Sequence, residues 1–446
     1  MRYLPASEED IRHMLAAAGL ERVEDLFSSI PPDLRAKDLD SPDGLSELEL
    51  ARRFLSRSRR NVSSTCRPCF LGAGAYAHHI PSPVDHVLLR TEFYTAYTPY
   101  QPETSQGTLQ SIYEFQTMMA DLTGMDYANA SLYDGASATA EAALMAWRAR
   151  KGGRILVARS LHPAYREVLA TYVRHLGIDI VEIPFGTDGR LDLDALGEDT
   201  CDGASALLVG QPNFFGIVED PAAIAERLPG KKPPLLTAVV SEALSLAALR
   251  APGSAGADIV AGDARSFGLP LGYGGPYLGF IASKKPFLRQ LPGRICGETT
   301  DTEGRRGYVL TLSTREQHIR REKATSNICT NQGLCMLAAT VYLSLTGRRG
   351  LAELARQNLS KAEYLKERLV EKGCEPVFTG PTFNEFAVRP RNRDGVSQAL
   401  RDANILGGYD LANAYPELEG AILLAATELV SRSDCDRLAD ILGGAS

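Results

Sequence analysis

Short apolar segments alternate with helical patterns through the middle of the chain. Between residues 108 and 283, helices are expected at 108–122 and 139–150, and His162 and Pro163 begin a further helix. The expected strands are continuous apolar runs at residues 155–158, 178–184, 206–211, 235–241, 257–262 and 277–283. Such runs between helices are typical of a mostly parallel sheet that is covered on both faces. The pattern therefore predicts an α/β fold for this region.

The two ends of the chain have different patterns. Near the N-terminus, Ser7 is an expected N-cap with Asp10 three positions later, before apolar residues at helical spacing. Near the C-terminus, helices expected at about 326–345 and 350–372 lead into alternating strands and helices, which predicts a small α+β unit. The expected organisation is a helical arm at 1–60, a large α/β domain at 61–330 and a small C-terminal α+β domain at 331–446.

Composition and charge exclude several classes of partner. The 446 residues are 44% hydrophobic, enough for a large core, and the formal net charge is -7. An acidic chain lacks the concentrated positive field that nucleic acids or anionic membranes attract as main partners. No apolar run approaches the roughly 20 residues that span a bilayer, and the N-terminus has no signal-peptide core. We therefore expect a cytoplasmic protein.

The eight cysteines predict neither a disulfide framework nor a metal site. They are scattered, and Cys66 and Cys69 alone form a CxxC spacing. Without a second pair, or histidines at ligand spacing, buried thiols are favoured over zinc or redox chemistry. No metal is expected.

Residues 256–280 have the pattern of the loop that presents a Schiff-base lysine to pyridoxal phosphate (PLP), without the lysine. A predicted strand leads into a small polar turn and a return rich in glycine and proline, and Arg265 stands where the lysine is expected. A guanidinium stays protonated and is a poor imine former. Glu242 lies twenty-odd positions earlier, where an acidic residue would face the pyridine nitrogen. The pattern predicts a pocket that cannot hold PLP covalently.

The expected phosphate-binding turn also departs from what the cofactor needs. Asp134, Gly135 and Ser137 stand at a predicted helix N-terminus, where N–H groups favour an anion. The Asp134 carboxylate would accept those groups itself and repel a phosphate, and a plain N-cap role agrees with a lost cofactor site. His162 stands in the region of the sequence where a residue that stacks on the cofactor ring is expected. It can equally be interpreted as a vestige of a lost cofactor site.

A tyrosine-rich segment is poorly explained by burial. Tyr94, Tyr97 and Tyr100 lie with Glu103 and Gln106 among two prolines and a glycine, which predicts a loop. Loops with several aromatic residues that have polar tips commonly build sites or interfaces. A role in a site or a subunit interface is therefore favoured over satisfied core tyrosines.

A basic, hydroxyl-rich turn precedes the expected helix at 326–345. Arg321, Thr325, Ser326 and Asn327 offer donors to a phosphate or carboxylate. The alternative, which stays open, is that Ser326 caps the helix and the cations form a solvated surface.

Several long strings together resemble one family. They are similar to subunit 1, the alpha subunit, of the two-subunit glycine dehydrogenase (decarboxylating), the P-protein of the glycine cleavage system. The strings are RTEFYTAYTPYQPETSQGTLQ (90–110), LTGMDYANASLYDGASATAEAA (122–143), QPNFFGIVED (211–220), residues 256–280, and REKATSNICTNQGL (321–334). His78 matches a histidine of the family, whereas Ala77 and His79 depart from its usual Asp and Tyr, so we expect His78 only to line a pocket.

The resemblance implies a PLP-dependent fold-type I architecture, like that of aspartate aminotransferase, in which the partner beta subunit holds the cofactor lysine. It implies that glycine is decarboxylated on PLP, that CO2 is released, and that the aminomethyl group passes to the lipoyl group of H-protein. In dimers of this fold each site borrows residues from its neighbour, so the tyrosine-rich segment would reach the beta subunit's pocket. The alternatives are a purely structural or regulatory subunit that stabilises beta, and an independent PLP enzyme.

Overall fold

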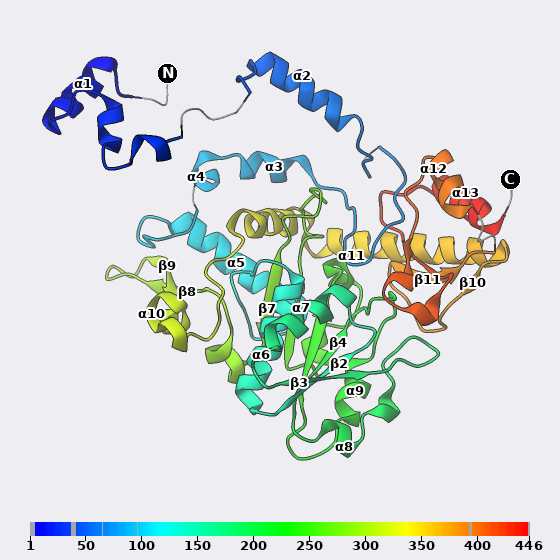
Figure 1. Ribbon diagram of the computed structural model, residues 1–446. Helices are drawn as coiled ribbons and strands as arrows, with labels where there is room; N and C mark the ends of the chain where they lie inside the picture. The colour runs from blue at the N-terminus through cyan, green and yellow to red at the C-terminus, as the bar shows by residue number, and fades with distance from the viewer. Residues whose placement is uncertain (1–4, 37–41, 65, 96, 392–394, 445–446) are drawn as a thin grey trace. The chain divides into compact units, whose positions relative to one another are not determined.

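The computed structural model describes residues 5–36, 42–64, 66–95, 97–391 and 395–444 (Figure 1). The chain divides into two units, Met1–Val62 and Ser63–Ser446. None of the helices in these described ranges is both long and apolar enough to cross a membrane.

The N-terminal unit is helical. It contains α1 (Glu8–Ala17), α2 (Glu47–Ser58) and the 3-10 turns η1 (Val23–Phe27) and η2 (Pro32–Leu34). Ser7 caps α1 as predicted, because its hydroxyl accepts the Asp10 amide while the Asp10 carboxylate accepts the Ser7 amide. Among the described residues of this unit, only Leu15 is buried, so the unit has almost no core of its own.

A seven-stranded sheet organises the larger unit, with strand order β1-β7-β6-β5-β4-β2-β3. The strands are β1 (Tyr127–Ala128), β2 (Arg154–Ala158), β3 (Asp179–Ile183), β4 (Ala204–Gly210), β5 (Leu235–Val240), β6 (Ile259–Asp263) and β7 (Gly279–Ser283). Neighbours from β3 to β6 pair in parallel, whereas β7 is antiparallel to β6 and β1 is antiparallel to β7. The predicted mostly parallel α/β sheet is confirmed.

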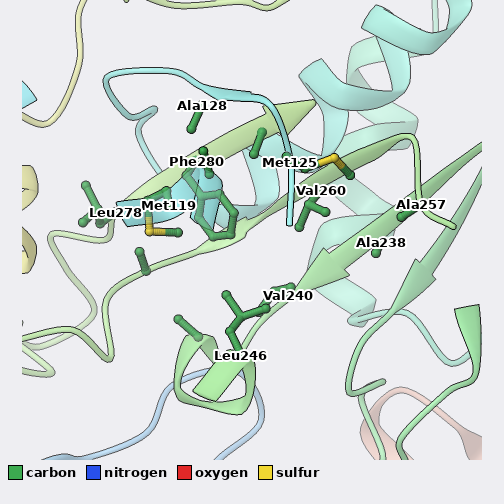
Figure 2. Close-up of a cluster of buried hydrophobic side chains, with 14 of the residues drawn as sticks. Met119, Met125, Ala128, Ala238, Val240, Leu246, Ala257, Val260, Leu278 and Phe280 are labelled. Atoms are coloured by element: carbon green, nitrogen blue, oxygen red, sulfur yellow. The ribbon is translucent and has the colours of Figure 1, made fainter. Parts of the chain in front are cut away.

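Alternate residues of the strands enter two different cores, as the two-residue period of a strand requires. On one face, Val260 and Phe280 pack with Met119 of α5 (Gln106–Thr123), as Figure 2 shows. On the other face, Ala261 and Ile281 belong to the cluster of α6 (Gly135–Arg150) and α7 (Pro163–Val173). Burial on both faces explains why these strands are continuous apolar runs.

A two-stranded hairpin, β8 (Ile295–Thr300) and β9 (Arg306–Thr311), was not predicted. It lies beside α5 (Figure 1). Two glutamine side chains of α5 pair with its backbone. The Gln106 amide accepts the Tyr308 N–H at 2.8 Å and donates to the Tyr308 carbonyl at 2.9 Å. Gln116 makes the same pair of bonds with Cys296, each at 2.9 Å. These two amides fix the hairpin to the helix.

The longest helix is α11 (Gly333–Glu371). Its backbone is non-helical at Gly347, so it consists of two helical segments, and two helices were expected in this region. It begins at Gly333 after the N-cap Gln332, so the expectation of a helix from 326 is wrong. The remaining helices of this unit are α3 (Ser82–Leu88), α4 (Thr91–Tyr94), α8 (Glu198–Cys201), α9 (Pro221–Arg227), α10 (Gln317–Arg320), α12 (Val396–Asp402) and α13 (Arg432–Gly443).

The C-terminal α+β pattern corresponds to a second, antiparallel sheet. Its strand order is β10-β11-β13-β12, and the strands are β10 (Glu375–Pro376), β11 (Glu385–Arg389), β12 (Tyr409–Asp410) and β13 (Ile422–Ala425). Its core joins Phe386 and Leu424 to Leu365 of α11 and Leu438 of α13.

Candidate functional site

Arg265 lies two residues beyond β6, at the carboxyl end of the parallel strands, where open α/β sheets bind ligands. Its side chain is buried, and its Cζ lies 4.7 Å from the centre of the Tyr277 ring. Nη2 is 3.5 Å from the Tyr76 carbonyl oxygen, and Nη1 has no hydrogen-bond partner within the described part of the chain. The position where the sequence predicts a lysine therefore holds a cation packed on an aromatic ring, with no amine that could form an imine.

Carboxylates accept hydrogen bonds from the backbone amides at the place where a cofactor phosphate is expected. Asp134 caps α6 as predicted, and its Oδ1 accepts the Ser137 amide at 2.7 Å. Asp263 at the end of β6 accepts the Gly135 amide at 3.0 Å and the Arg265 amide at 2.8 Å. Burial raises the pKa of Asp263 to about 6, although those two amides favour its charged form.

Tyr165 closes the same turn from α7. A Cβ atom placed on Gly135 would lie 2.3 Å from the Tyr165 hydroxyl oxygen, which is closer than atoms can approach. Two carboxylates and a phenol thus surround amides that would have to bind a phosphate dianion. The residues present do not fit PLP in this pocket.

His162 makes ring contacts within this chain on two sides. Its ring stacks on Tyr165, with centres 4.6 Å apart, and meets Phe214 edge-on at 4.9 Å. Nε2 lies 2.9 Å from the Ala73 carbonyl oxygen, and Nδ1 accepts the Ala164 amide as the cap of α7. Burial lowers the pKa of His162 to about 4, so the ring is neutral at pH 7. The candidate stacking residue is therefore engaged by its own subunit.

Glu242 pairs with a histidine. It follows β5, as predicted, and its Oε2 lies 3.1 Å from Nε2 of His78. Nδ1 of His78 lies 2.9 Å from Oε2 of Glu428, which follows β13. Burial lowers the pKa of His78, but the two carboxylates outweigh it and raise the value to about 10. His78 is thus a buried cation that joins the ends of strands from both sheets.

A second buried carboxylate lies in the same region and was missed by the sequence analysis. Glu385 of β11 accepts the Tyr76 hydroxyl at 2.8 Å and the Ala73 amide at 2.6 Å. Burial raises the pKa of Glu385 to about 8, opposed by these two bonds and assisted by Glu242. Residues 73–78 therefore connect the large sheet to the small one through charged and polar contacts.

The three tyrosines of the aromatic segment are exposed. Tyr94, Tyr97 and Tyr100 are 61%, 69% and 77% exposed, so the alternative of satisfied core tyrosines is wrong. The Tyr97 and Tyr100 rings lie 6.4 Å apart, and Glu103 is also exposed. Gln106 differs, because its amide is occupied by the hairpin backbone and by the Pro102 carbonyl.

The basic turn presents some of its residues to solvent. Arg321 is exposed and has a φ of 52°, in the left-handed region, and Asn327 is exposed too. Thr325 and Ser326 are half-buried: the Thr325 amide donates to the Arg315 carbonyl, and the Ser326 hydroxyl accepts the Ile328 amide. Because α11 begins only at Gly333, the alternative that Ser326 caps this helix is wrong.

The structure brings the aromatic segment and the end of the string 321–334 together. A small cleft between them is lined by residues that include Tyr97, Thr98, Asn331 and Leu334. Arg294, which the sequence analysis did not single out, contacts both sides of this junction. Neither Arg294 nor Asp263 had a local signal, because their partners are distant in sequence.

The CxxC pair is less buried than expected. Cys66 is exposed and Cys69 is half-buried, so the prediction that both are buried is wrong. Burial raises the pKa of the Cys69 thiol, which makes it a weaker nucleophile at neutral pH. Among the described residues, no group of three or more His, Cys, Asp or Glu side chains could hold a metal ion.

Comparisons with known proteins agree over the whole chain. Residues 1–442 match the family model described as glycine cleavage system P-protein. The chain is 48% identical over 445 residues to a probable glycine dehydrogenase (decarboxylating) subunit 1 of Carboxydothermus hydrogenoformans, with 100% of both chains covered. A crystal structure of glycine decarboxylase (P-protein) of the glycine cleavage system, in inhibitor-bound form, is 42% identical, with a TM-score of 0.91 and 100% of both chains covered.

More distant structures share the fold alone. A glutamate decarboxylase of Lactobacillus brevis is 14% identical, with a TM-score of 0.67 over 95% of this chain and 96% of that chain. The architecture is that of PLP-dependent fold-type I enzymes, as expected. By its full-length match, the chain belongs to the glycine cleavage system P-protein family.

Proposed function

We propose that this chain is the subunit without the cofactor-binding lysine in a two-subunit glycine dehydrogenase (decarboxylating). A second subunit, beta, binds PLP through its own lysine. Together the two subunits decarboxylate glycine, release CO2 and transfer the aminomethyl group to the lipoyl group of H-protein. PLP supplies the electron sink for loss of CO2. One observation supports this division most strongly: Arg265, Asp263 and Tyr165 fill the cofactor-type pocket of this chain.

The contribution of this chain is then a wall of its partner's site. Tyr94, Tyr97 and Tyr100 are rigid aromatic side chains with free faces, which suits them to exclude water and to donate hydrogen bonds across a subunit interface. Glu103 lies exposed in the same segment.

The basic turn supplies positive charge and polar donors to the same wall. Arg321 and Asn327 are exposed, so they can bind an anionic group on the substrate or cofactor. Thr325 and Ser326 support the turn from within. Gln106 and His78 would not contact the partner's site through hydrogen bonds, because their polar atoms already bond groups within this subunit.

Reassembly of separately purified subunits tests the proposal. Glycine-dependent exchange of CO2 is measured with lipoylated H-protein for this chain, for beta, and for the mixture. We expect turnover only from the mixture, because PLP and the site wall come from different subunits. Turnover of glycine by this chain alone would contradict the proposal.

A further inference from the structure

Arg294 connects three segments that are distant in sequence. It lies one residue before β8, and its side chain is 14% exposed. Its Nη1 contacts the Thr98 hydroxyl and lies 3.3 Å from Asn331 Oδ1 and 3.5 Å from Thr330 Oγ1. Its Nε lies 3.9 Å from the carboxylate of Glu316, which is itself 11% exposed. A single guanidinium thus holds groups from residues 98, 316 and 330–331.

The backbone of Arg294 is fixed between the segment that follows β1 and the hairpin. The Arg294 carbonyl accepts the Ala130 amide at 2.9 Å, and the next residue, Ile295, pairs with Thr311 in the hairpin. The neighbouring Gly293 carbonyl accepts a bond from the buried Arg315 at 3.0 Å. Arg294 therefore extends from a rigid position.

The segment that it reaches has weaker support of its own. Within the described residues 98–105, the backbone hydrogen bonds are local, such as Tyr100 N to Thr98 O and Thr104 N to Gln101 O. Thr98 lies between the exposed Tyr97 and Tyr100. A bond from a charged donor to Thr98 is consequently an important restraint on where these two rings stand.

We propose that Arg294 is a positioning residue for the site wall. Its guanidinium holds Thr98 and Asn331 together, so that the aromatic segment and the basic turn face the partner's site as one surface. This inference rests on the proposed function, in which that surface lines the beta subunit's pocket. Arg294 uses Nη1 for Thr98, Thr330 and Asn331 and Nε for Glu316, whereas a lysine has one nitrogen for all four groups, so we do not expect lysine to replace it.

Hydrogen exchange of the isolated chain tests the restraint without any cofactor. Arg294→Met and Arg294→Lys are expected to speed amide exchange about tenfold in peptides covering residues 97–105 and 326–332, the effect of losing a charged hydrogen bond. Thr98→Val should do the same for 97–105, Thr98→Ser should not, and Arg294→Met/Thr98→Val should add little to either single change. Arg289→Met, at an exposed arginine of the nearby turn η6 (Lys285–Gln290), is the control and should change neither peptide.

Turnover of the reassembled complex tests the consequence. We expect kcat to fall at least about tenfold in Arg294→Met, Arg294→Lys and Thr98→Val. The KM for glycine and the affinity for beta should stay within about threefold of the wild-type values. Misplaced catalytic groups mainly slow the chemical step and affect binding less. Unchanged exchange in both peptides would overturn the inference and leave the proposed function standing. Faster exchange with unchanged kcat would also overturn the inference, because the position of the two segments would then have no part in the reaction, whereas the proposed function fails only if this chain alone turns over glycine.

Discussion

Asp263 accepts a hydrogen bond from the backbone amide of Gly135 at 3.0 Å, so that a carboxylate occupies the turn where we expect a cofactor phosphate to bind in this fold. The bond joins the end of β6 to the first residue of α6, two elements 128 positions apart. The same carboxylate accepts the amide of Arg265, the residue at the expected lysine position. One carboxylate therefore connects the expected lysine position to the expected phosphate position.

Arg265→Lys should not restore cofactor binding. The substitution returns an amine to the pocket, but Asp134, Asp263 and Tyr165 still occupy the phosphate position and repel an anion. Purified variant mixed with PLP should show no aldimine absorbance and no mass increase after borohydride. A reducible adduct at the substituted position would show that the lysine alone had been missing.

The phenols of the aromatic segment should matter for turnover. Tyr97→Phe and Tyr100→Phe keep the ring but remove the hydroxyl, and we expect each to lower kcat of the complex by about tenfold, the range for one lost transition-state hydrogen bond. Binding to beta, measured by calorimetry, should change little. Tyr364→Phe on α11, which loses a bond to Asp436, is the control and should keep full turnover. Full activity of both test variants would favour a purely structural subunit.

Removal of His78 should destabilise the fold in a pH-dependent way. The folded pKa of His78 is raised to about 10, above its ordinary 6.5, so its contribution is complete below pH 6.5 and is lost as pH rises through 10. His78→Gln leaves Glu242 and Glu428 without their buried cation, which should cost about 3–5 kcal/mol at pH 7. Urea unfolding of both proteins from pH 6 to pH 10 should show the difference shrinking; a constant difference would argue against a charged His78.

Gln116 should be more important for stability than its place on a helix suggests. Gln116→Leu leaves the Cys296 N–H and carbonyl without partners in a buried site, which should cost about 2–4 kcal/mol of unfolding free energy. Gln357→Leu, whose amide reaches Glu353 on the surface of α11, should cost far less in the same urea titration. Equal effects would mean that the hairpin is held by other contacts.

Sequence patterns predicted the strands that are buried on both faces, and they missed the hairpin β8–β9 and the short strand β1. β4 and β5 are buried at every position, so they are continuous apolar runs. The hairpin β8–β9 is largely exposed beyond Cys296, and β1 has two residues, so neither has an apolar signature. The region 326–332 is held by tertiary contacts such as Gln332 N to Ser131 Oγ, which local helix propensity does not report.

The site divides in the same way. Arg265 and the Asp134 cap follow from short-range patterns, because a strand, a turn and a helix start are local features. The bonds of Asp263 to Gly135, Arg294 to Thr98 and His78 to Glu428 span 128, 196 and 350 positions. Such pairs become visible only when the fold brings the strand ends together.

Borohydride trapping with PLP on the isolated wild-type chain tests directly whether its pocket can hold the cofactor. The chain and the beta subunit are each mixed with PLP, reduced, digested and searched by mass spectrometry for a pyridoxyl group on lysine. We expect a stoichiometric adduct on one lysine of beta and no stoichiometric adduct on this chain. A stoichiometric adduct on a lysine of this chain would contradict the claim that its pocket has been closed to the cofactor.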